Sequence, residues 1–439
     1  MRLTASHYSS SANRRVLLQE ANTSSIFQVP DSAFKVQALL LLAMDAYISL
    51  ENSRGCEIQR QAIEIAKGIG MHRRDYSYLV GQHGPIVQES WRRTWWDCYT
   101  LAALTSAIHG TNLVELVSLE DIDVPLPGPC DDYKDCRPPQ DLQTLDEMRD
   151  RMFTDDNFTF SSFAYKIEAT TIMLSALRLS RESFAITDAQ IDAIDASIAN
   201  FLLSLPQDSR QVASRDGAVD ELIFAAHMII HWVTIIMHRP HSSLAILRSH
   251  YDTECTKIRT PADVPSSFNL HTSKALDAAN ALSNLATIRT PLENHTPCFA
   301  CSIALSATVH LPAYLLESDP TRSQTLKGRL RLALSTLGTL SEIFPIAAIV
   351  KRQLGQFARD TFIHPAKTAA TRDETNIALD AATTQLPTLT HQAFGAYDDA
   401  MPNDFTGADE GSLWLSNLIA SGGLEQSDLG MTMDFEANE

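Results

Sequence analysis

The chain contains 439 residues, and 44% of them are hydrophobic, which is enough for a sizeable buried core. Its 53 aspartates and glutamates outnumber its 35 lysines and arginines, so the formal net charge is −18. This excess repels phosphate groups and argues against direct binding of nucleic acid or of an anionic membrane by the chain as a whole.

The cysteines and the apolar stretches indicate a soluble protein of the cell interior. Seven cysteines, odd in number and scattered, do not form a disulfide framework. The first residues contain no apolar core of a secretory signal. The longest apolar stretch, residues 222–237, is shorter than the ~20 residues of a membrane span and contains histidines. We therefore expect a reducing compartment and no membrane segment.

Helical periodicity dominates the chain. Strand patterns bounded by Asn-Gly or Asp-Gly turns do not occur. Thr187 and Gln190 form a capping box at the start of one helix, and Pro206 follows its end. The predicted helices span residues 37–50, 54–70, 89–109, 160–179, 187–205, 222–238, 271–289, 299–318 and 322–354. The predicted fold class is all-α, a helical bundle or solenoid-like domain.

Three parts are expected along the chain. Residues 1–34 are rich in Ser and Asn without a clear period, and we expect them to be flexible. Residues 35–372 form the helical body, interrupted over about 127–157 by a surface excursion rich in Pro, Asp and Arg. Residues 373–439 form a separate tail.

The tail differs from the body in charge. It contains thirteen acidic residues, and the last basic residue of the chain is Arg372. This composition favours disorder. One hypothesis is an acidic activation-type segment that folds on binding a partner, and the alternative is a closing helix packed on the body. The apolar residues between the acids include Trp414, Leu415, Leu418, Ile419, Met433 and Phe435.

Catalytic and cofactor motifs are missing from the sequence. No G-x-S-x-G, G-x-x-x-x-G-K-[ST] or H-E-x-x-H occurs, and we expect no catalytic residue, cofactor or metal. Cys298 and Cys301 form a lone C-x-x-C, which we interpret as core or helix-start cysteines. His227, His231 and His238 share one helix face, which is either a metal- or ligand-binding face or a set of structural histidines.

Four blocks of residues follow one another in a specific order: 61–73 (QAIEIAKGIGMHR), 89–99 (ESWRRTWWDCY), 121–127 (DIDVPLP) and 231–240 (HWVTIIMHRP). With this order and spacing the chain resembles the fungal-specific transcription factor domain, the middle homology region of the zinc binuclear cluster regulators. The resemblance spans roughly residues 35–350. It implies an all-helical regulatory domain whose family-motif residues are Arg92, Arg93, Trp95, Trp96, Asp121, Asp123, Pro125, His238, Arg239 and Pro240.

Two of these residues, Arg92 and Arg93, allow two interpretations. As a functional pair they would sense a ligand or a partner. As structural residues, one of them would pack its stem on an indole and pair with an acid such as Asp97, Asp121 or Asp123.

The sequence departs from the family in one respect that bears on function. The family reads DNA with six clustered cysteines that hold two zinc ions, whereas the first cysteine here is Cys56, within a predicted helix. The resemblance therefore implies a regulator without its own DNA-binding zinc cluster.

We accordingly expect a positive co-regulator of a fungal secondary-metabolite or nutrient pathway. Its expected partners are a DNA-binding transcription factor and the transcription machinery, with a homo- or heterodimer and a small-molecule effector as further partners, and no direct binding of nucleic acid or membrane. Because no Lys/Arg cluster marks nuclear entry, we expect a nuclear location together with a partner and otherwise a cytoplasmic one. The alternative is a small-molecule-sensing or inhibitory binding module that titrates a full-length relative.

Overall fold

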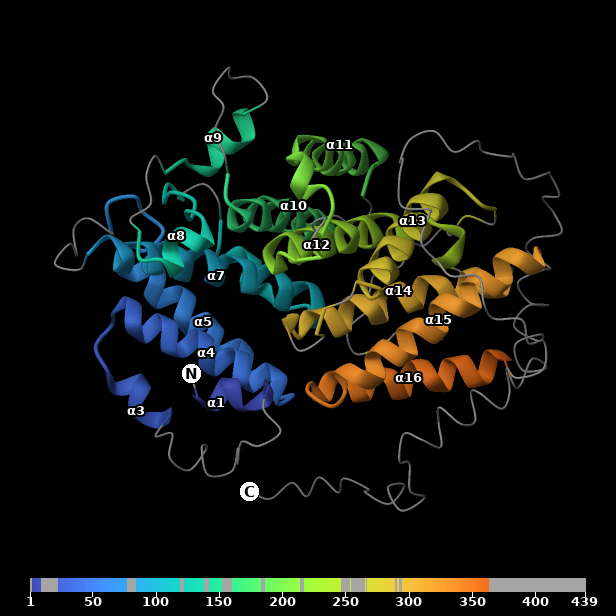
Figure 1. Cartoon of the computed structure of the whole chain (residues 1–439), viewed down its shortest axis with the longest axis horizontal. Coiled ribbons are helices and arrows are strands. Elements are labelled where there is room, and N and C mark those ends of the chain that lie inside the picture. The colour runs from blue at the N-terminus through green and yellow to red at the C-terminus, as the bar shows by residue number, and fades with distance from the viewer. Residues whose placement is uncertain are drawn as a thin grey trace, which may run out of the picture. The chain divides into compact units, whose positions relative to one another are not determined.

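Helices form nearly all of the regular structure that can be described (Figure 1). The computed structural model describes residues 2–8, 23–76, 84–118, 122–137, 142–151, 160–182, 186–213, 217–245, 253, 265, 267–288, 290–291 and 294–362. Within these ranges the extended backbone pairs only once, in an isolated bridge between Ala213 and Val219. The prediction of an all-α fold is confirmed.

The chain divides into two compact units, Met1–Leu354 and Gly355–Glu439. The boundary falls within helix α16 (Pro345–Phe362). The predicted acidic tail belongs to the second unit, and residues 373–439 lie outside the described residues. Disorder and partner binding by Trp414, Leu415, Leu418, Ile419, Met433 and Phe435 therefore stay predictions.

The first long helices of the first unit, α4 (Ala33–Ile48) and α5 (Asn52–Gly68), form a helical hairpin. Ser32 caps α4 by accepting a hydrogen bond from the Lys35 N–H (3.3 Å). The two helices approach closely at Gly55, which lies under the Tyr47 ring. A Cβ atom at position 55 would come within 3.0 Å of that ring.

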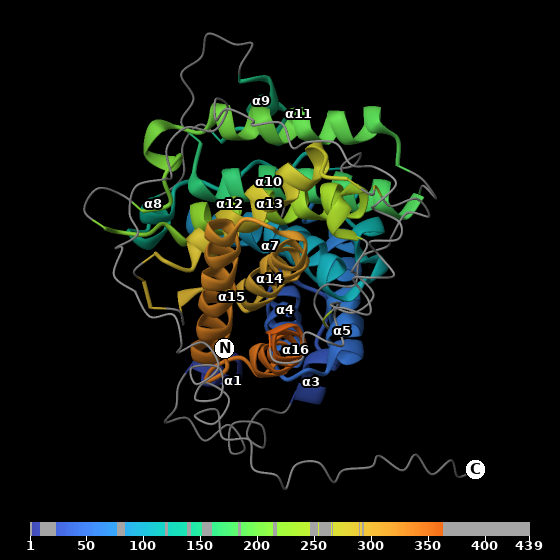
Figure 2. The same cartoon turned by 90° about the vertical axis from the view of Figure 1, so that its right-hand side faces the viewer.

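A long helix, α7 (Pro85–His109), packs on this hairpin and on α10 (Ser162–Glu182). It ends where Gly110 adopts a φ of 66°, a left-handed conformation that glycine reaches without steric cost. Helix α12 (Glu221–His238) packs along α10. Figures 1 and 2 both place α11 (Asp188–Ser204) over α10 and α12. The predicted capping box at its start is present, since Thr187 and Gln190 bond to each other's backbone N–H.

The series continues through α13 (Leu270–Leu285), α14 (Cys298–Leu316) and α15 (Pro320–Leu340), each packed on the one before it. This serial packing is the expected solenoid-like arrangement. By length and composition α12 and α14 could each cross a membrane, but most of each helix is buried inside the protein, as in the core of a globular domain.

Part of the N-terminal segment is more ordered than we expected. Helix α1 (Arg2–Ala5) and the 3-10 turn η1 (Ser6–Tyr8) contact α4. The Thr4 hydroxyl donates to the Leu41 carbonyl (3.1 Å), and His7 Nε2 lies 3.0 Å from Asp45 Oδ1. These tertiary contacts hold residues 2–8 against α4, although the segment has no periodicity of its own.

Two other expectations need correction. The predicted helix over residues 322–354 is two helices, since α15 ends at Leu340 and α16 starts at Pro345, whose missing N–H suits the first position of a helix. The excursion near 127–157 contains two short helices, α8 (Cys130–Lys134) and α9 (Leu145–Asp150). Leu145 and Met148 of α9 are buried, so this segment joins the core rather than only the surface.

Candidate functional site

The predicted arginine pair belongs to a buried ionic cluster on α7. Arg92 Nε donates to one oxygen of the Glu89 carboxylate (2.9 Å), and Arg93 Nε donates to the other (2.8 Å). The Glu89 side chain is only 1% exposed, and Arg92 is 4% exposed. The acid that pairs with both arginines is therefore Glu89, which we had not considered.

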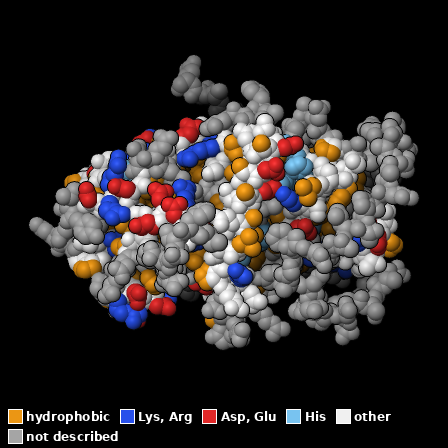
Figure 3. Space-filling view, turned by 90° about the horizontal axis from the view of Figure 1, so that it is seen from above, with side chains coloured by type: hydrophobic (Ala, Val, Ile, Leu, Met, Phe, Trp, Pro, Cys, Tyr) orange, Lys and Arg blue, Asp and Glu red, His pale blue; other side chains and the backbone are white. Residues whose placement is uncertain are grey.

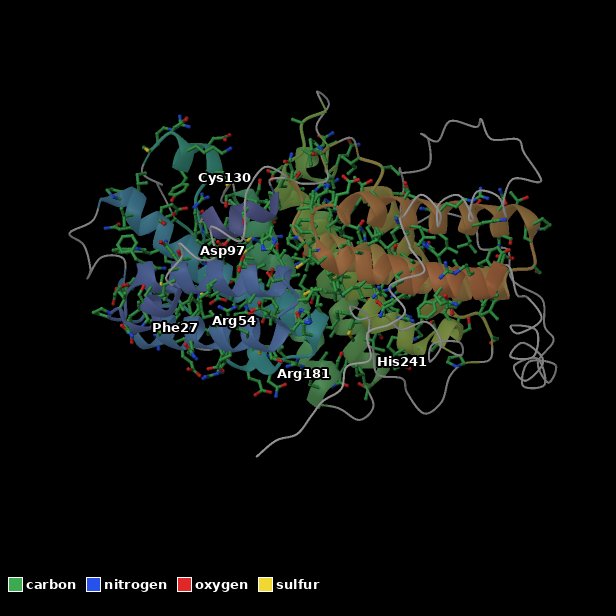
Figure 4. The ribbon with its side chains drawn as sticks, turned by 90° about the horizontal axis from the view of Figure 1, so that it is seen from below. Phe27, Arg54, Asp97, Cys130, Arg181 and His241 are labelled. Atoms are coloured by element: carbon green, nitrogen blue, oxygen red, sulfur yellow. The ribbon has the colours of Figure 1, made fainter. Side chains whose placement is uncertain are left out.

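Arg93 extends this cluster to a loop. Its guanidinium donates to the Gly128 carbonyl (2.8 Å) and to the Cys130 sulfur (3.4 Å) and lies over the Tyr133 ring, 4.4 Å from its centroid. The Gly128 N–H in turn donates to Glu89 (3.0 Å). Glu89 and Arg93 thus clamp the segment that contains Cys130, labelled in Figure 4, against α7.

The same loop is attached to α7 at a second point. Trp96 Nε1 donates to the Pro125 carbonyl (3.0 Å), and Trp95 and Trp96 are almost fully buried. Asp123 accepts a hydrogen bond from the Arg74 N–H (2.8 Å), and its own N–H donates to the His72 carbonyl (3.2 Å). Arg92, Arg93, Trp96, Asp123 and Pro125 therefore belong to one structural unit that fastens an extended segment to α7 and to the turn after α5.

The other two aspartates that we considered as partners of the arginines are Asp97 and Asp121. Asp97, labelled in Figure 4, lies on the exposed side of α7 and pairs with Lys166 (3.5 Å). Asp121 lies outside the described residues.

The His238-Arg239-Pro240 block forms a separate cluster at the end of α12. His238 Nε2 lies 2.8 Å from Asp195 Oδ1 on α11, and His238 Nδ1 lies 2.8 Å from His271 Nδ1 on α13. Arg239 and Pro240 are buried and begin the 3-10 turn η5 (Arg239–His241). This block joins three helices through His238.

The three histidines of α12 do not converge. His227 Nε2 lies 3.0 Å from the Ser209 carbonyl oxygen, and the rings of His227 and His231 are 6.4 Å apart. Burial lowers the pKa of His227, and it lowers the pKa of His231 to about 3, with the neighbouring His227 adding to the effect. No three His, Cys, Asp or Glu side chains among the described residues are placed to hold a metal ion. These contacts favour structural histidines over a metal face.

The C-x-x-C cysteines sit at the start of α14. Cys298 is its first residue, and Cys301 is buried one turn later. Both positions match the interpretation as core or helix-start cysteines.

Sequence reasoning missed a second buried ion pair. Arg151 donates to both oxygens of Glu168 on α10 (2.9 and 3.0 Å) and also contacts Ser204 of α11. Burial raises the pKa of Glu168 even though Arg151 opposes the shift. The two residues are seventeen positions apart, so no local spacing could have indicated the pair.

Together these features define an all-helical domain in which buried charged side chains hold loops against the helices. Residues 1–233 match the family described as "Fungal specific transcription factor domain", and the chain belongs to that family. The predicted resemblance is confirmed, although the match begins at residue 1 rather than near residue 35.

One curated relative adds to this assignment. The chain is 30% identical over 340 residues to the C6 finger domain transcription factor iacK of Pestalotiopsis fici. The alignment covers 76% of this chain and 49% of the relative, so the chain spans about half the length of that protein. No solved structure matches the chain.

Proposed function

We propose that this protein is a nuclear transcriptional regulator that acts through a DNA-binding partner, as a positive co-regulator of a fungal biosynthetic or nutrient pathway. The observation that carries the proposal is the family match over residues 1–233 in a sequence without a six-cysteine cluster. The matched residues form the first part of the helical domain, from its N-terminus into α12. A secondary-metabolite pathway is our preferred setting.

The positions of the cysteines support a partner for DNA reading. The described cysteines lie on or beside four different helices, and Cys98 and Cys301 are buried in the core. A C6 finger, the element in the printed name of the relative, needs its cysteines side by side around zinc. The net charge of −18 also opposes binding of the sequence as a whole to phosphate. We therefore propose that the helical domain does not itself recognise DNA and depends on a separate DNA-binding element.

The tail supports a positive role. Its thirteen acids without a base keep the interleaved apolar residues in water until a partner groove accepts them. Trp414, Leu415 and Leu418 are the residues that we expect to enter such a groove.

Two experiments test the proposal. Residues 373–439, fused to an unrelated DNA-binding module, should activate a reporter, and a control in which Trp414, Leu415 and Leu418 are changed to Ser should not. A silent wild-type fusion would remove the activating role. The purified full chain should not shift a labelled duplex at 150 mM salt, and a sequence-specific shift would remove the need for a partner.

An inhibitory role is the second candidate, because a helical domain of this family could pair with a full-length family member. A helical domain that pairs with a full-length family member would then titrate it. Co-expression should in that case lower the reporter output of the full-length protein, whereas a co-regulator should raise it. A small-molecule effector of the helical body stays a further proposal, tested by thermal stabilisation of the full chain with pathway metabolites.

A further inference from the structure

Both ring nitrogens of His238 have a partner on another helix. Its Nε2 lies 2.8 Å from the Asp195 carboxylate of α11, and its Nδ1 lies 2.8 Å from Nδ1 of His271 of α13. The His238 side chain is 1% exposed. Figure 3, which views the α11 side of the molecule, shows histidine at the surface beside acidic and basic side chains. One buried imidazole therefore links three helices.

The Asp195 carboxylate determines which ring nitrogen of His238 carries a hydrogen. Asp195 also accepts from Lys274 of α13. Burial alone would raise the pKa of Asp195, but the hydrogen bonds from His238 and Lys274 outweigh burial and lower it. An ionised carboxylate can only accept hydrogen bonds. His238 Nε2 must therefore carry a hydrogen at neutral pH.

Only one hydrogen can lie between Nδ1 of His238 and Nδ1 of His271. In the neutral pair, His271 carries it and donates to His238. After one proton is added to the pair, a single hydrogen still lies between the two Nδ1 atoms, because one ring donates and the other accepts. A second added proton would direct two N–H groups at each other across 2.8 Å, so the contact would have to break.

We propose that His238 and His271 share one proton as a latch between α12 and α13, and that a second proton opens it. The charged and titratable groups around the latch are Asp188 and Asp195 of α11, Arg239 and His241 of η5, and Lys274 of α13. The His241 ring lies 5.5 Å from His271. The cluster thus contains three imidazoles, one lysine and one arginine against two carboxylates, so it accepts limited positive charge.

The surroundings set the acidity at which the latch opens. Burial lowers the pKa of His271, and the neighbouring His238 and His241 lower it further, while Asp188 opposes the shift. Burial and His238 likewise lower the pKa of His241. Because an ordinary histidine titrates near pH 6.5, the second proton enters only below about that pH.

Opening of the latch would affect only the start of α13. The start of α13 is also attached by Asn269, which donates to the His241 carbonyl (2.9 Å), and by Thr272, which accepts from the Ser243 N–H (3.0 Å). These uncharged bonds do not change with pH in the acid range. We expect acid to loosen the first turn of α13 while the remaining helices stay folded.

Two measurements on the full chain test the latch. Nitrogen-15 spectra of labelled histidines report which ring nitrogen carries hydrogen, and at pH 7.5 we expect Nε2–H on His238 and Nδ1–H on His271. Hydrogen exchange of peptides from the start of α13, corrected for the intrinsic effect of pH, should be about tenfold less protected at pH 5.5 than at pH 7.5, since one pKa unit corresponds to a tenfold change in the opening equilibrium.

Variants separate the latch from general acid effects. His271→Asn keeps an N–H donor for His238 but cannot take up a proton, so its α13 protection should not respond to acid. His227→Asn, on the same helix but bonded to Ser209, should keep the wild-type response. Equal loss of protection in wild type and His271→Asn would overturn the proposal. So would independent titration of the two rings in the wild-type spectra, or micromolar zinc that shifts both rings and protects α13, which would indicate a metal site instead.

Discussion

Replacement of Glu89 by Gln should destabilise the first unit strongly. The buried carboxylate accepts from Arg92, from Arg93 and from the Gly128 N–H. The amide of Gln keeps one accepting oxygen but removes the charge that two buried guanidinium groups require. Loss of one partner from a buried ion pair costs about 3–5 kcal/mol. We expect about 3 kcal/mol for Gln, and a value nearer 5 kcal/mol for Ala, which accepts no hydrogen bond.

Urea unfolding followed by tryptophan fluorescence measures this cost. Trp91, Trp95 and Trp96 lie on α7 beside the cluster and are buried, so their emission reports its loss. The matched control is Glu57→Gln, which breaks an exposed pair with Arg60 on α5 and should leave the unfolding midpoint unchanged.

Limited proteolysis adds a local measurement. Because Arg93 holds residues 128–133 against α7, Glu89→Gln should speed tryptic cleavage after Lys134 and Arg137 under native conditions. If Glu89→Gln unfolds at the same urea concentration as Glu57→Gln and resists trypsin as the wild type does, then the clamp does not stabilise this segment and our interpretation of the motif is wrong.

Three further changes test other parts of the structure. Trp96→Phe removes the donor to the buried Pro125 carbonyl and should cost about 1–3 kcal/mol in urea unfolding, whereas a cost below experimental error would show that the carbonyl finds another donor. Thr187→Ala removes the cap of α11 and should cost about 1 kcal/mol by the same assay, while Thr187→Ser should behave as the wild type. Burial lowers the pKa of His231 and of His310 to about 3, so below about pH 6.5 the unfolded chain binds these protons and the folded chain does not. The free energy of unfolding should therefore fall as pH drops from about 6.5 toward 3, and urea midpoints that stay level between pH 7.5 and pH 5 would contradict this.

The helices were predictable because residues close to each helix end determine where the helix begins and ends. The capping box of Thr187 and Gln190, the proline after α11 and the glycine after α7 each act within one turn of the residue concerned. The N-terminal helix could not be found in this way, since Thr4 and His7 are held by groups on α4 that lie 37 and 38 positions away. The break before α16 was visible as Pro345, but a continuous apolar pattern on both sides concealed it.

The candidate site shows a sharper limit of sequence reasoning. Glu89 and Asp97 both lie four residues from Arg93, on opposite sides, so helical spacing alone allows either pair. Glu89 is the partner because it faces the loop at Gly128, where the second arginine and a backbone N–H complete its hydrogen bonds. Asp97 faces Lys166 on α10. The choice depends on what packs against each face of α7, which the sequence does not state.

A common arrangement links these clusters. Glu89 and Arg93 hold the loop that contains Cys130, Arg151 and Glu168 hold α9, and His238 holds the start of α13. In each case a buried charged or polar side chain fastens a segment to a helix of the series. Because the three clusters share no residue, substitutions in two of them should have additive costs. Substitutions in different clusters would release different segments. Each cluster therefore controls one surface of the domain, and the packed series of helices remains.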